Sequence, residues 1–254
     1  MVFNSIFFIF CFLPVFMLIY YLVPGKLRNL LLFLGSLIFY AWGEPVYVIL
    51  MLFSSIFNYY MGTELERLYY DDRKQKINLI FSIIINLAVL VFFKYYGFLL
   101  NTIGGIIGIH IPHPELSLPI GLSFYTFRNL SYLFDIYLSK VSAQRNFLTF
   151  SVYSTMFPYT SAGPIVRYTD IETQLKQRTI NISKFGIGAE LFVKGLAKKV
   201  LLADNLSVLY SSICGHPQMS VFTSWLGILA YTMQLYFDFS GYSDMAIGLG
   251  KMFG

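Results

Sequence analysis

Charged residues are scarce in this chain of 254 residues, and that scarcity determines its class. Only 12% of the residues are Asp, Glu, Lys or Arg, whereas 57% are hydrophobic and 19% are aromatic. A soluble globular domain carries about 25% charged residues. The low charge therefore excludes a soluble domain of this size and predicts an all-α, polytopic membrane protein.

Cysteine and histidine are also rare. The two cysteines, Cys11 and Cys214, are far apart in the sequence, so neither a disulfide framework nor a metal-ligand spacing is present. We therefore predict no metal site. The three histidines, His110, His113 and His216, stand in Gly- and Pro-containing loops, where a side chain is seldom held firmly enough to act as a general base. The composition alone thus yields no assembled active site.

Long uncharged runs predict membrane-spanning helices. The run from Phe3 to Val23 has no charge, and a helix needs about 20 apolar residues to cross a bilayer. A signal peptide is excluded there because no basic residue precedes the run and no cleavage site of small residues follows it. Further helices are predicted over 27–42, 45–61, 77–93 and 118–138, the first two forming a hairpin.

Polar stretches predict the connections between these helices. Loops are expected over 63–76, 101–117 and 158–184, which contain most of the basic residues, Gly and Pro outside the apolar runs. Residues 147–157 are apolar but too few to cross a bilayer, so a re-entrant or interfacial segment is expected there.

The predicted span over 118–138 contains two ionisable residues. Arg128 and Asp135 are seven residues apart, close to two helical turns, so both side chains lie along one face. Ionisable groups at membrane depth are costly and usually face a cavity or a partner. Two interpretations stay open: the pair lines a tunnel, or it clamps neighbouring helices together.

The helix predicted over 187–206 has a cationic edge. Glu190, Lys194 and Lys198 follow one another at four-residue steps, and apolar residues fill most of the other faces. This pattern is typical of a helix at the bilayer interface. The alternative is that Lys194, Lys198 or Lys199 contacts the phosphates of an anionic acyl donor.

The final apolar segment contains the best candidate site. Tyr236, Ser240 and Asp244 recur every four residues and form one stripe on a helix, whereas Asp238 points elsewhere. Gly241 weakens the helix and permits a break. A broken helix with carboxylates at membrane depth is tolerated where it lines protein or a wet cavity. A purely structural kink is the alternative.

Four ordered motifs carry a family resemblance that extends over nearly the whole chain. They are LPIGLSFYTF at 118–127, AGPIVRY at 162–168, GLAKKV at 195–200 and YFDFSGYSDMA at 236–246. Together they resemble the membrane-bound O-acyltransferase family, and most closely its alginate O-acetyltransferase branch. Arg128 is a departure, because an uncharged polar residue is expected after the first motif.

The resemblance implies a bundle of many membrane helices around a tunnel, with re-entrant or interfacial helices. The residues implied to line the tunnel or the substrate path are Tyr236, Asp238, Ser240, Tyr242, Ser243 and Asp244, besides Arg128 and Asp135, and further motif residues are Gly163, Pro164, Arg167, Lys198 and Lys199. The catalytic histidine of the family matches no residue here and is expected beyond Gly254. Residues 1–254 are therefore expected to form the amino-terminal part of a single membrane domain, inactive alone.

The resemblance also implies a function. The intact protein is expected to transfer acetyl groups across the cell membrane to hydroxyls of an extracellular polysaccharide such as alginate, cellulose or peptidoglycan, with acetyl-CoA as donor and no bound cofactor. Implied partners are membrane lipids and a secreted or membrane-anchored esterase-like (SGNH) acetyltransferase. Nucleic acid is not a predicted partner, because the net charge of +5 belongs to short loops. The alternatives are a transporter- or flippase-like bundle without chemistry of its own, and D-alanyl transfer to teichoic acid.

The distribution of basic residues predicts the topology. They gather after the first, third and fifth predicted spans, and positive loops are cytoplasmic. A multi-pass protein of the inner membrane with its amino terminus outside is expected.

Single cysteines at Ser5 and Gln75 test this topology. An impermeant thiol reagent should label Ser5→Cys in intact cells and should not label Gln75→Cys. The reverse labelling pattern would contradict the predicted topology.

Overall fold

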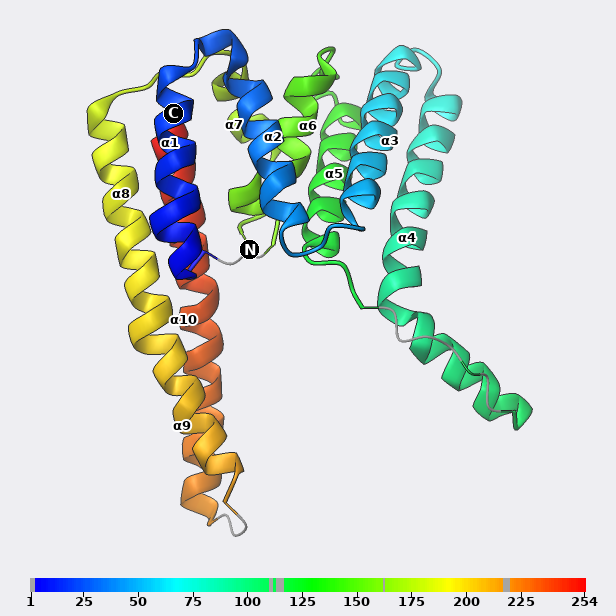
Figure 1. The fold of residues 1–254 in the computed structure, drawn as a ribbon. Helices are drawn as coiled ribbons and strands as arrows, with labels where there is room; N and C mark the ends of the chain where they lie inside the picture. The colour runs from blue at the N-terminus through cyan, green and yellow to red at the C-terminus, as the bar shows by residue number, and fades with distance from the viewer. Residues whose placement is uncertain (1–2, 110–111, 113–116, 162, 217–219) are drawn as a thin grey trace. The chain divides into compact units, whose positions relative to one another are not determined.

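The computed structural model describes residues 3–109, 112, 117–161, 163–216 and 220–254, and all regular elements within them are helical (Figure 1). They are η1 (Phe8–Phe12), α1 (Leu13–Leu22), η2 (Gly25–Leu27), α2 (Arg28–Ala41), α3 (Val48–Arg67), α4 (Asp72–Ile107), α5 (Leu122–Tyr137), α6 (Phe147–Thr155), η3 (Phe157–Tyr159), α7 (Tyr168–Lys176), α8 (Ile182–Ala197), η4 (Lys198–Ala203), α9 (Asp204–Cys214) and α10 (Val221–Phe253). The predicted all-helical class is confirmed for these residues.

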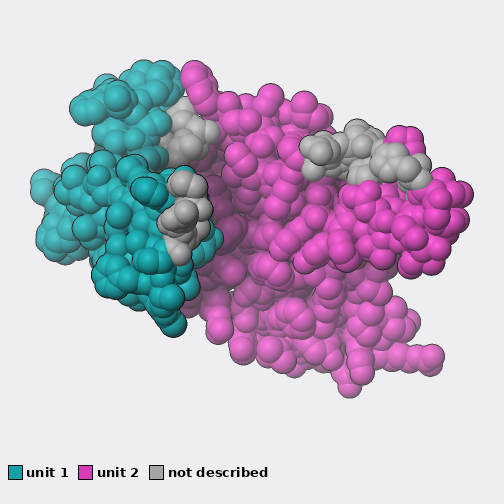
Figure 2. Space-filling model, turned by 90° about the horizontal axis from the view of Figure 1, so that it is seen from below, with its two compact units in different colours: residues 1–23, 162–164, 177–254 teal, residues 24–161, 165–176 magenta. Residues whose placement is uncertain are grey.

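Two of these helices, α3 and α4, are long and apolar enough to cross a membrane. The first predicted span is shorter than expected, because its apolar helix extends only over Phe8–Leu22. The chain divides into two compact units, which Figure 2 colours separately. Unit 1 comprises residues 1–23, 162–164 and 177–254, and unit 2 comprises residues 24–161 and 165–176.

Unit 1 is built on a long antiparallel pair of helices. The continuous helical run α8–η4–α9 packs along α10. Four glycines form the contact, and we call them the glycine seam: Gly188 and Gly195 on α8, Gly241 and Gly248 on α10. A Cβ atom on Gly195 would lie 2.5 Å from the Gly241 carbonyl oxygen, and one on Gly188 would lie 2.6 Å from that of Gly248. Only glycine permits this approach of two backbones.

The first helix of unit 1 closes the carboxyl end of α10. Tyr20 Oη donates a hydrogen bond of 2.6 Å to the Phe253 carbonyl, and Tyr21 Oη donates to the Met252 carbonyl. The last carbonyls of a helix have no partner within the helix. The two hydroxyls therefore satisfy acceptors that would otherwise need water.

Unit 2 is centred on α5, which packs against α3, α4, α6 and α7. The predicted hairpin of two helices over 27–42 and 45–61 is wrong in its packing, although both helices form. The reason is that α2 packs mainly on α6, whereas α3 packs mainly on α5 and α4.

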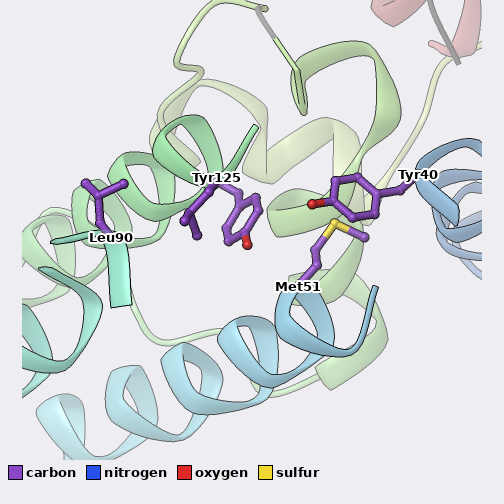
Figure 3. Close-up of a cluster of buried hydrophobic side chains, with 5 residues drawn as sticks. Tyr40, Met51, Leu90 and Tyr125 are labelled. Carbon is purple, nitrogen blue, oxygen red and sulfur yellow. The ribbon is translucent and has the colours of Figure 1, made fainter. Parts of the chain in front are cut away.

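A buried cluster joins four helices of unit 2. It consists of Tyr40 from α2, Met51 from α3, Leu90 from α4, and Leu122 and Tyr125 from α5 (Figure 3). The hydroxyls of Tyr40 and Tyr125 have no hydrogen-bond partner within the described residues. An unpartnered buried hydroxyl costs about 1–3 kcal/mol, so the apolar contacts of the rings must outweigh that cost.

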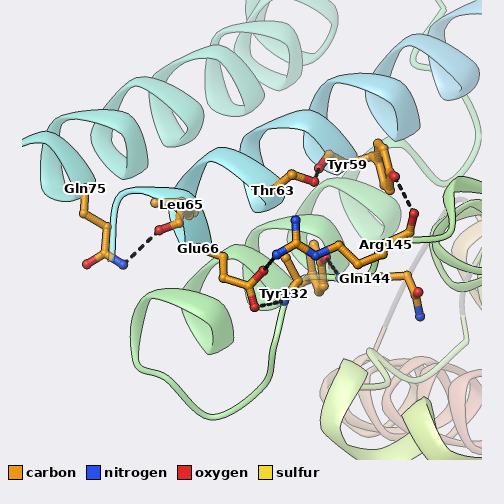
Figure 4. A network of polar contacts seen from close by, with 9 residues as sticks. Tyr59, Thr63, Leu65, Glu66, Gln75, Tyr132, Gln144 and Arg145 are labelled. Carbon is orange, nitrogen blue, oxygen red and sulfur yellow. Dashed lines mark hydrogen bonds and ion pairs between the residues drawn. The ribbon is translucent and has the colours of Figure 1, made fainter. Parts of the chain in front are cut away.

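A polar network joins the carboxyl end of α3 to the connection between α5 and α6 (Figure 4). Glu66 accepts from the Ala143 amide at 3.2 Å and forms an ion pair with Arg145. Tyr132 Oη accepts from the Gln144 amide at 2.8 Å. Gln75 is buried here and donates to the Leu65 carbonyl at 3.0 Å.

The burial of Gln75 affects the topology test. Position 75 is inaccessible to a thiol reagent, and the exposed Arg73 is the better labelling position.

The predicted loops are shorter than expected because helices extend past the apolar runs. α3 continues to Arg67 and α4 begins at Asp72, so most of the predicted loop 63–76 is helical. Asp71 caps α4 by accepting from the Lys74 amide at 3.1 Å, and the hydrogen bond from the Lys74 ammonium lowers the pKa of Asp71. The 36-residue α4 also enters the predicted loop 101–117, and α7 lies inside the predicted linker 158–184.

The glycine seam yields a stability prediction. A methyl group at Gly195 would press on a backbone carbonyl, so the helices must separate, and we expect Gly195→Ala to destabilise unit 1 by about 1–3 kcal/mol. Gly186→Ala, on the same helix, is the matched control, because a Cβ atom at Gly186 meets nothing within 4 Å. Thermal unfolding in detergent compares them; equal melting temperatures of the two variants would contradict the seam.

Candidate functional site

The predicted break at Gly241 is wrong: α10 is one continuous helix from Val221 to Phe253. Gly241 serves the close contact with Gly195 instead. The irregular segment lies on the facing helical run, where residues Lys198–Ala203 form the π-helix η4. π-Helical turns are rare and occur frequently at functional sites.

Lys198, at the start of this π-helix, contacts two of the predicted site residues. Its ammonium donates to Asp244 Oδ2 at 2.6 Å and to Ser240 Oγ at 3.0 Å. Ser240 and Asp244 therefore share one face of α10, as expected. The third member of the predicted stripe, Tyr236, does not join them and is 63% exposed.

Lys199 contacts the carboxylate predicted to point elsewhere. Its Nζ lies 2.8 Å from Asp238 Oδ1 and 3.0 Å from Asp204 Oδ1. Asp204 was not among the residues that sequence reasoning singled out, because in a regular helix its side chain would not meet Lys199. The sequence carries no signal of the π-helical turn, so the five-residue spacing of Lys199 and Asp204 did not predict their contact.

We call Lys198, Lys199, Asp204, Asp238, Ser240 and Asp244 the lysine–aspartate cluster. Its three carboxylates and two ammonium groups leave a formal charge of −1, and each lysine already has a carboxylate partner. This arrangement gives no support to phosphate contacts by Lys198 or Lys199. Lys194 forms an exposed pair with Glu190 at 2.6 Å on the same helix, and such pairs contribute little.

The helix that carries these lysines differs from the prediction over 187–206. The helical run extends from Ile182 to Cys214, and one side of it packs against α10 through the glycine seam. The predicted interfacial stripe does not include Gly188 and Gly195, which define that packed side.

The remaining residues of the last motif have other surroundings. Tyr242 stacks on Phe3, with ring centroids 4.7 Å apart and an angle of 15° between the ring planes. Ser243 lies on α10 and is half-buried.

Residues 163–167 of the second motif lie in irregular backbone. Gly163 and Pro164 belong to unit 1, and Arg167 belongs to unit 2. The exposed Arg167 side chain forms no ion pair with a described residue, whereas Tyr153 Oη donates to the Val166 carbonyl at 3.3 Å. Next to this segment, α7 begins at Tyr168, whose Oη accepts from Gln144 Nε2 at 2.7 Å; burial raises the pKa of Tyr168 to about 12.

Glycine is required in the first motif. Gly121 begins α5 with a φ of 74°, and a Cβ atom there would collide with the Thr160 carbonyl. Both the left-handed backbone and the close approach exclude larger residues. The motif thereby aligns α5 with the segment that follows α6.

Arg128 on α5 is buried and binds backbone carbonyls at the end of α6 and in η3. Its guanidinium donates to Tyr153 O at 3.2 Å, to Ser154 O at 3.3 Å and to Tyr159 O. An arginine that donates to these carbonyls fastens the last turn of α6 and η3 to α5. These contacts favour the helix-clamp interpretation for Arg128.

Asp135 is buried near the other end of α5. Its Oδ1 lies 3.9 Å from Lys140 Nζ, and its Oδ2 has no hydrogen-bond partner within the described residues. A tunnel-lining role for Asp135 stays a prediction.

Of the three histidines, His216 belongs to the described residues, and it is not part of the lysine–aspartate cluster. His110 and His113 lie outside the described residues. His216 lines an open pocket of about 300 Å³ with Ser212, Ile213, Ser220 and Thr223, at the turn between α9 and α10. Within the described ranges, no group of three His, Cys, Asp or Glu side chains is arranged to hold a metal ion.

Comparison with known families identifies the chain's relatives. The sequence model of the MBOAT, membrane-bound O-acyltransferase, family matches residues 42–254, which is most of the chain. This chain belongs to that family. The resemblance seen in the four motifs is therefore confirmed, and the chain is a member of a membrane-bound family.

Individual curated proteins align with all or part of the chain. The probable alginate O-acetylase AlgI of Pseudomonas aeruginosa is 41% identical over 258 residues, which cover 100% of this chain and 50% of that protein. A peptidoglycan O-acetyltransferase of Helicobacter pylori is 33% identical and is covered over 54% of its length. A teichoic acid D-alanyltransferase of Bacillus subtilis is 27% identical over 57% of this chain. The chain thus spans about half the length of the first two relatives.

The two interpretations of Arg128 differ in a measurable way. A clamp predicts that Arg128→Met destabilises unit 2 by at least about 2 kcal/mol, because three buried carbonyls lose a charged donor. The exposed Arg167→Met serves as the control. Thermal unfolding and the amount of protein in the membrane are measured; an Arg128→Met variant as stable as the parent would contradict the clamp and favour a tunnel lining.

Proposed function

We propose that this MBOAT member is an O-acyltransferase that moves acetyl groups across the cell membrane to hydroxyls of an extracellular polysaccharide, such as alginate, cellulose or peptidoglycan. One observation carries the proposal. The whole chain, with all four motifs, aligns with proteins named for alginate and peptidoglycan O-acetylation. The chain spans about half their length, so the activity belongs to the whole protein.

The lysine–aspartate cluster is the proposed wall of the acyl path. In our proposal the membrane helices form a bundle around a tunnel, and Asp238, Ser240 and Asp244 face that tunnel with their lysine partners. Charges are costly at membrane depth and are retained there mainly for function. Paired charges lower that cost, because each ammonium neutralises a carboxylate that would otherwise be unpaired.

The general base of the reaction is proposed to come from outside the cluster. Transfer of an acetyl group to a hydroxyl needs a base within hydrogen-bond reach of the hydroxyl proton. Within the described residues, no histidine contacts the cluster. The family histidine expected beyond Gly254 would supply this role, with the cluster shaping the path toward it.

The donor, the partner and the orientation belong to the same proposal. Acetyl-CoA is the proposed donor on the cytoplasmic side, and a secreted or membrane-anchored esterase-like transferase is the proposed partner that delivers the group to the polymer. The protein is proposed to cross the inner membrane several times with its amino terminus outside. The basic residues after the first, third and fifth predicted spans support this orientation.

D-Alanyl transfer to teichoic acid is the second candidate reaction. It also moves an acyl group to a hydroxyl, and the Bacillus subtilis relative aligns over 57% of this chain. The alginate relative aligns over all of the chain at higher identity, so it favours acetyl transfer. A transporter-like bundle would transfer no acyl group at all, which the assay below detects.

Charge removal at the cluster tests the proposal. We expect Asp238→Asn and Asp244→Asn, expressed from the gene's own locus, to lower polymer O-acetylation by about 10- to 100-fold, because each leaves a lysine without its carboxylate partner on α10. The exposed Asp170→Asn is the control. O-Acetyl content of the secreted polymer and protein level in the membrane are both measured. Normal acetylation in both cluster variants would contradict the proposed site.

A further inference from the structure

The π-helix η4 creates an ion pair that a regular helix cannot form. Lys199 and Asp204 are five residues apart, and their charged atoms lie 3.0 Å apart. In an α-helix, residues five apart point about 140° away from each other, since each residue turns the helix by about 100°. In a π-helix, residue i bonds to residue i+5, so these two side chains come together. The pair therefore depends on the π-helical turn.

The same lysine also reaches the opposite helix. Lys199 Nζ lies 2.8 Å from Asp238 Oδ1 on α10, and 23% of the Lys199 side chain is exposed. One ammonium thus connects the π-helical turn to α10. On the other side of the turn, Gly195 packs on Gly241 with no space for adjustment.

We infer that Asp204 is a positioning residue of the proposed acyl path, which holds the Lys199 ammonium against Asp238 by stabilising the π-helical turn. The inference rests on the proposed function for its catalytic meaning, although its geometry does not. Without Asp204, Lys199 keeps only the Asp238 carboxylate as a partner. The π-helical turn, which is less favourable than a regular α-helical turn, then loses the ion pair between Lys199 and Asp204. A regular turn would rotate the chain beyond it by about 100°, away from its present register with α10.

Lysine reactivity tests the geometry without any activity assay. The purified protein in detergent is treated with a small amine-acylating reagent, and modification at each lysine is measured by mass spectrometry. Two carboxylates keep the Lys199 amine protonated and slow to react. We expect Asp204→Asn to raise labelling of Lys199 by about three-fold or more, and Asp204→Glu to restore slow labelling. Unchanged labelling of Lys199 in Asp204→Asn would overturn the inference.

A matched control separates this effect from a general loosening of the helix. Glu190→Gln removes a carboxylate from another lysine pair of the same helical run, and Lys194 forms no ion pair with α10 in the described chain. Glu190→Gln is expected to raise labelling of Lys194 and to leave Lys199 unchanged. Raised labelling of Lys199 in Glu190→Gln would mean that the helix loosens as a whole, and would overturn the specific role of Asp204.

Polymer O-acetylation tests the catalytic meaning. A displacement of about 1 Å can cost up to 10²-fold in rate, so we expect about a ten-fold loss in Asp204→Asn at normal membrane level, with recovery in Asp204→Glu. In a Lys199→Met background, Asp204→Asn should add no further loss. Independent, multiplying losses would overturn the inference. Changed Lys199 labelling in a protein that never acetylates polymer would overturn the proposed function and leave the geometry of Asp204 intact.

Discussion

The contact between two helix backbones at the glycine seam is the constraint on which unit 1 depends. Because Gly195 and Gly241 have no side chains, α8 and α10 approach closely enough for short polar side chains to meet across them. Serine and aspartate reach only a short distance from the backbone, so at a wider spacing Lys198 would not contact Ser240 and Asp244 together. The packing of the smallest residues thereby determines where the charges lie.

The pairing of these charges explains why the helix pair tolerates them. Each aspartate of α10 in the cluster has a lysine partner on the facing helical run. A lone carboxylate in such apolar surroundings is strongly unfavourable, whereas a paired one costs much less. Removing one partner is therefore more harmful than removing a pair, because it leaves the other charge uncompensated.

Sequence reasoning predicted much of the fold and part of the site. Composition sufficed to predict the helical class. In lipid, the backbone N–H and C=O groups of a long uncharged run must form hydrogen bonds within the protein, and a helix forms them within the run itself. The four-residue spacing of Ser240 and Asp244 predicted their shared face, and the seven-residue spacing of Arg128 and Asp135 predicted their burial on α5. Helix ends were placed too early, because Glu, Lys and Arg at helix ends resemble loop residues.

Two features of the site that sequence reasoning did not predict have physical explanations. Gly241 was interpreted as a breaker, since propensity describes an isolated helix and contains no information about the facing backbone. Asp204 escaped notice because its contact with Lys199 exists only in a π-helical turn. The contact of Gly241 arises from pairing with a distant segment, whereas the contact of Asp204 arises from a local change of helix type. Local sequence periodicity reports on neither.

The hydroxyl caps on α10 have a consequence for biogenesis. Tyr20 lies 233 residues before its acceptor, Phe253, so the first helix is made long before the helix it caps. At a synthesis rate of about 5–20 residues per second, roughly 10–50 s separate the two. During that interval the aromatic face of α1 has no α10 to pack against, and lipid or an insertion chaperone must shield it. Unit 1 is thus completed late, whereas most of unit 2 is made and can assemble during the wait.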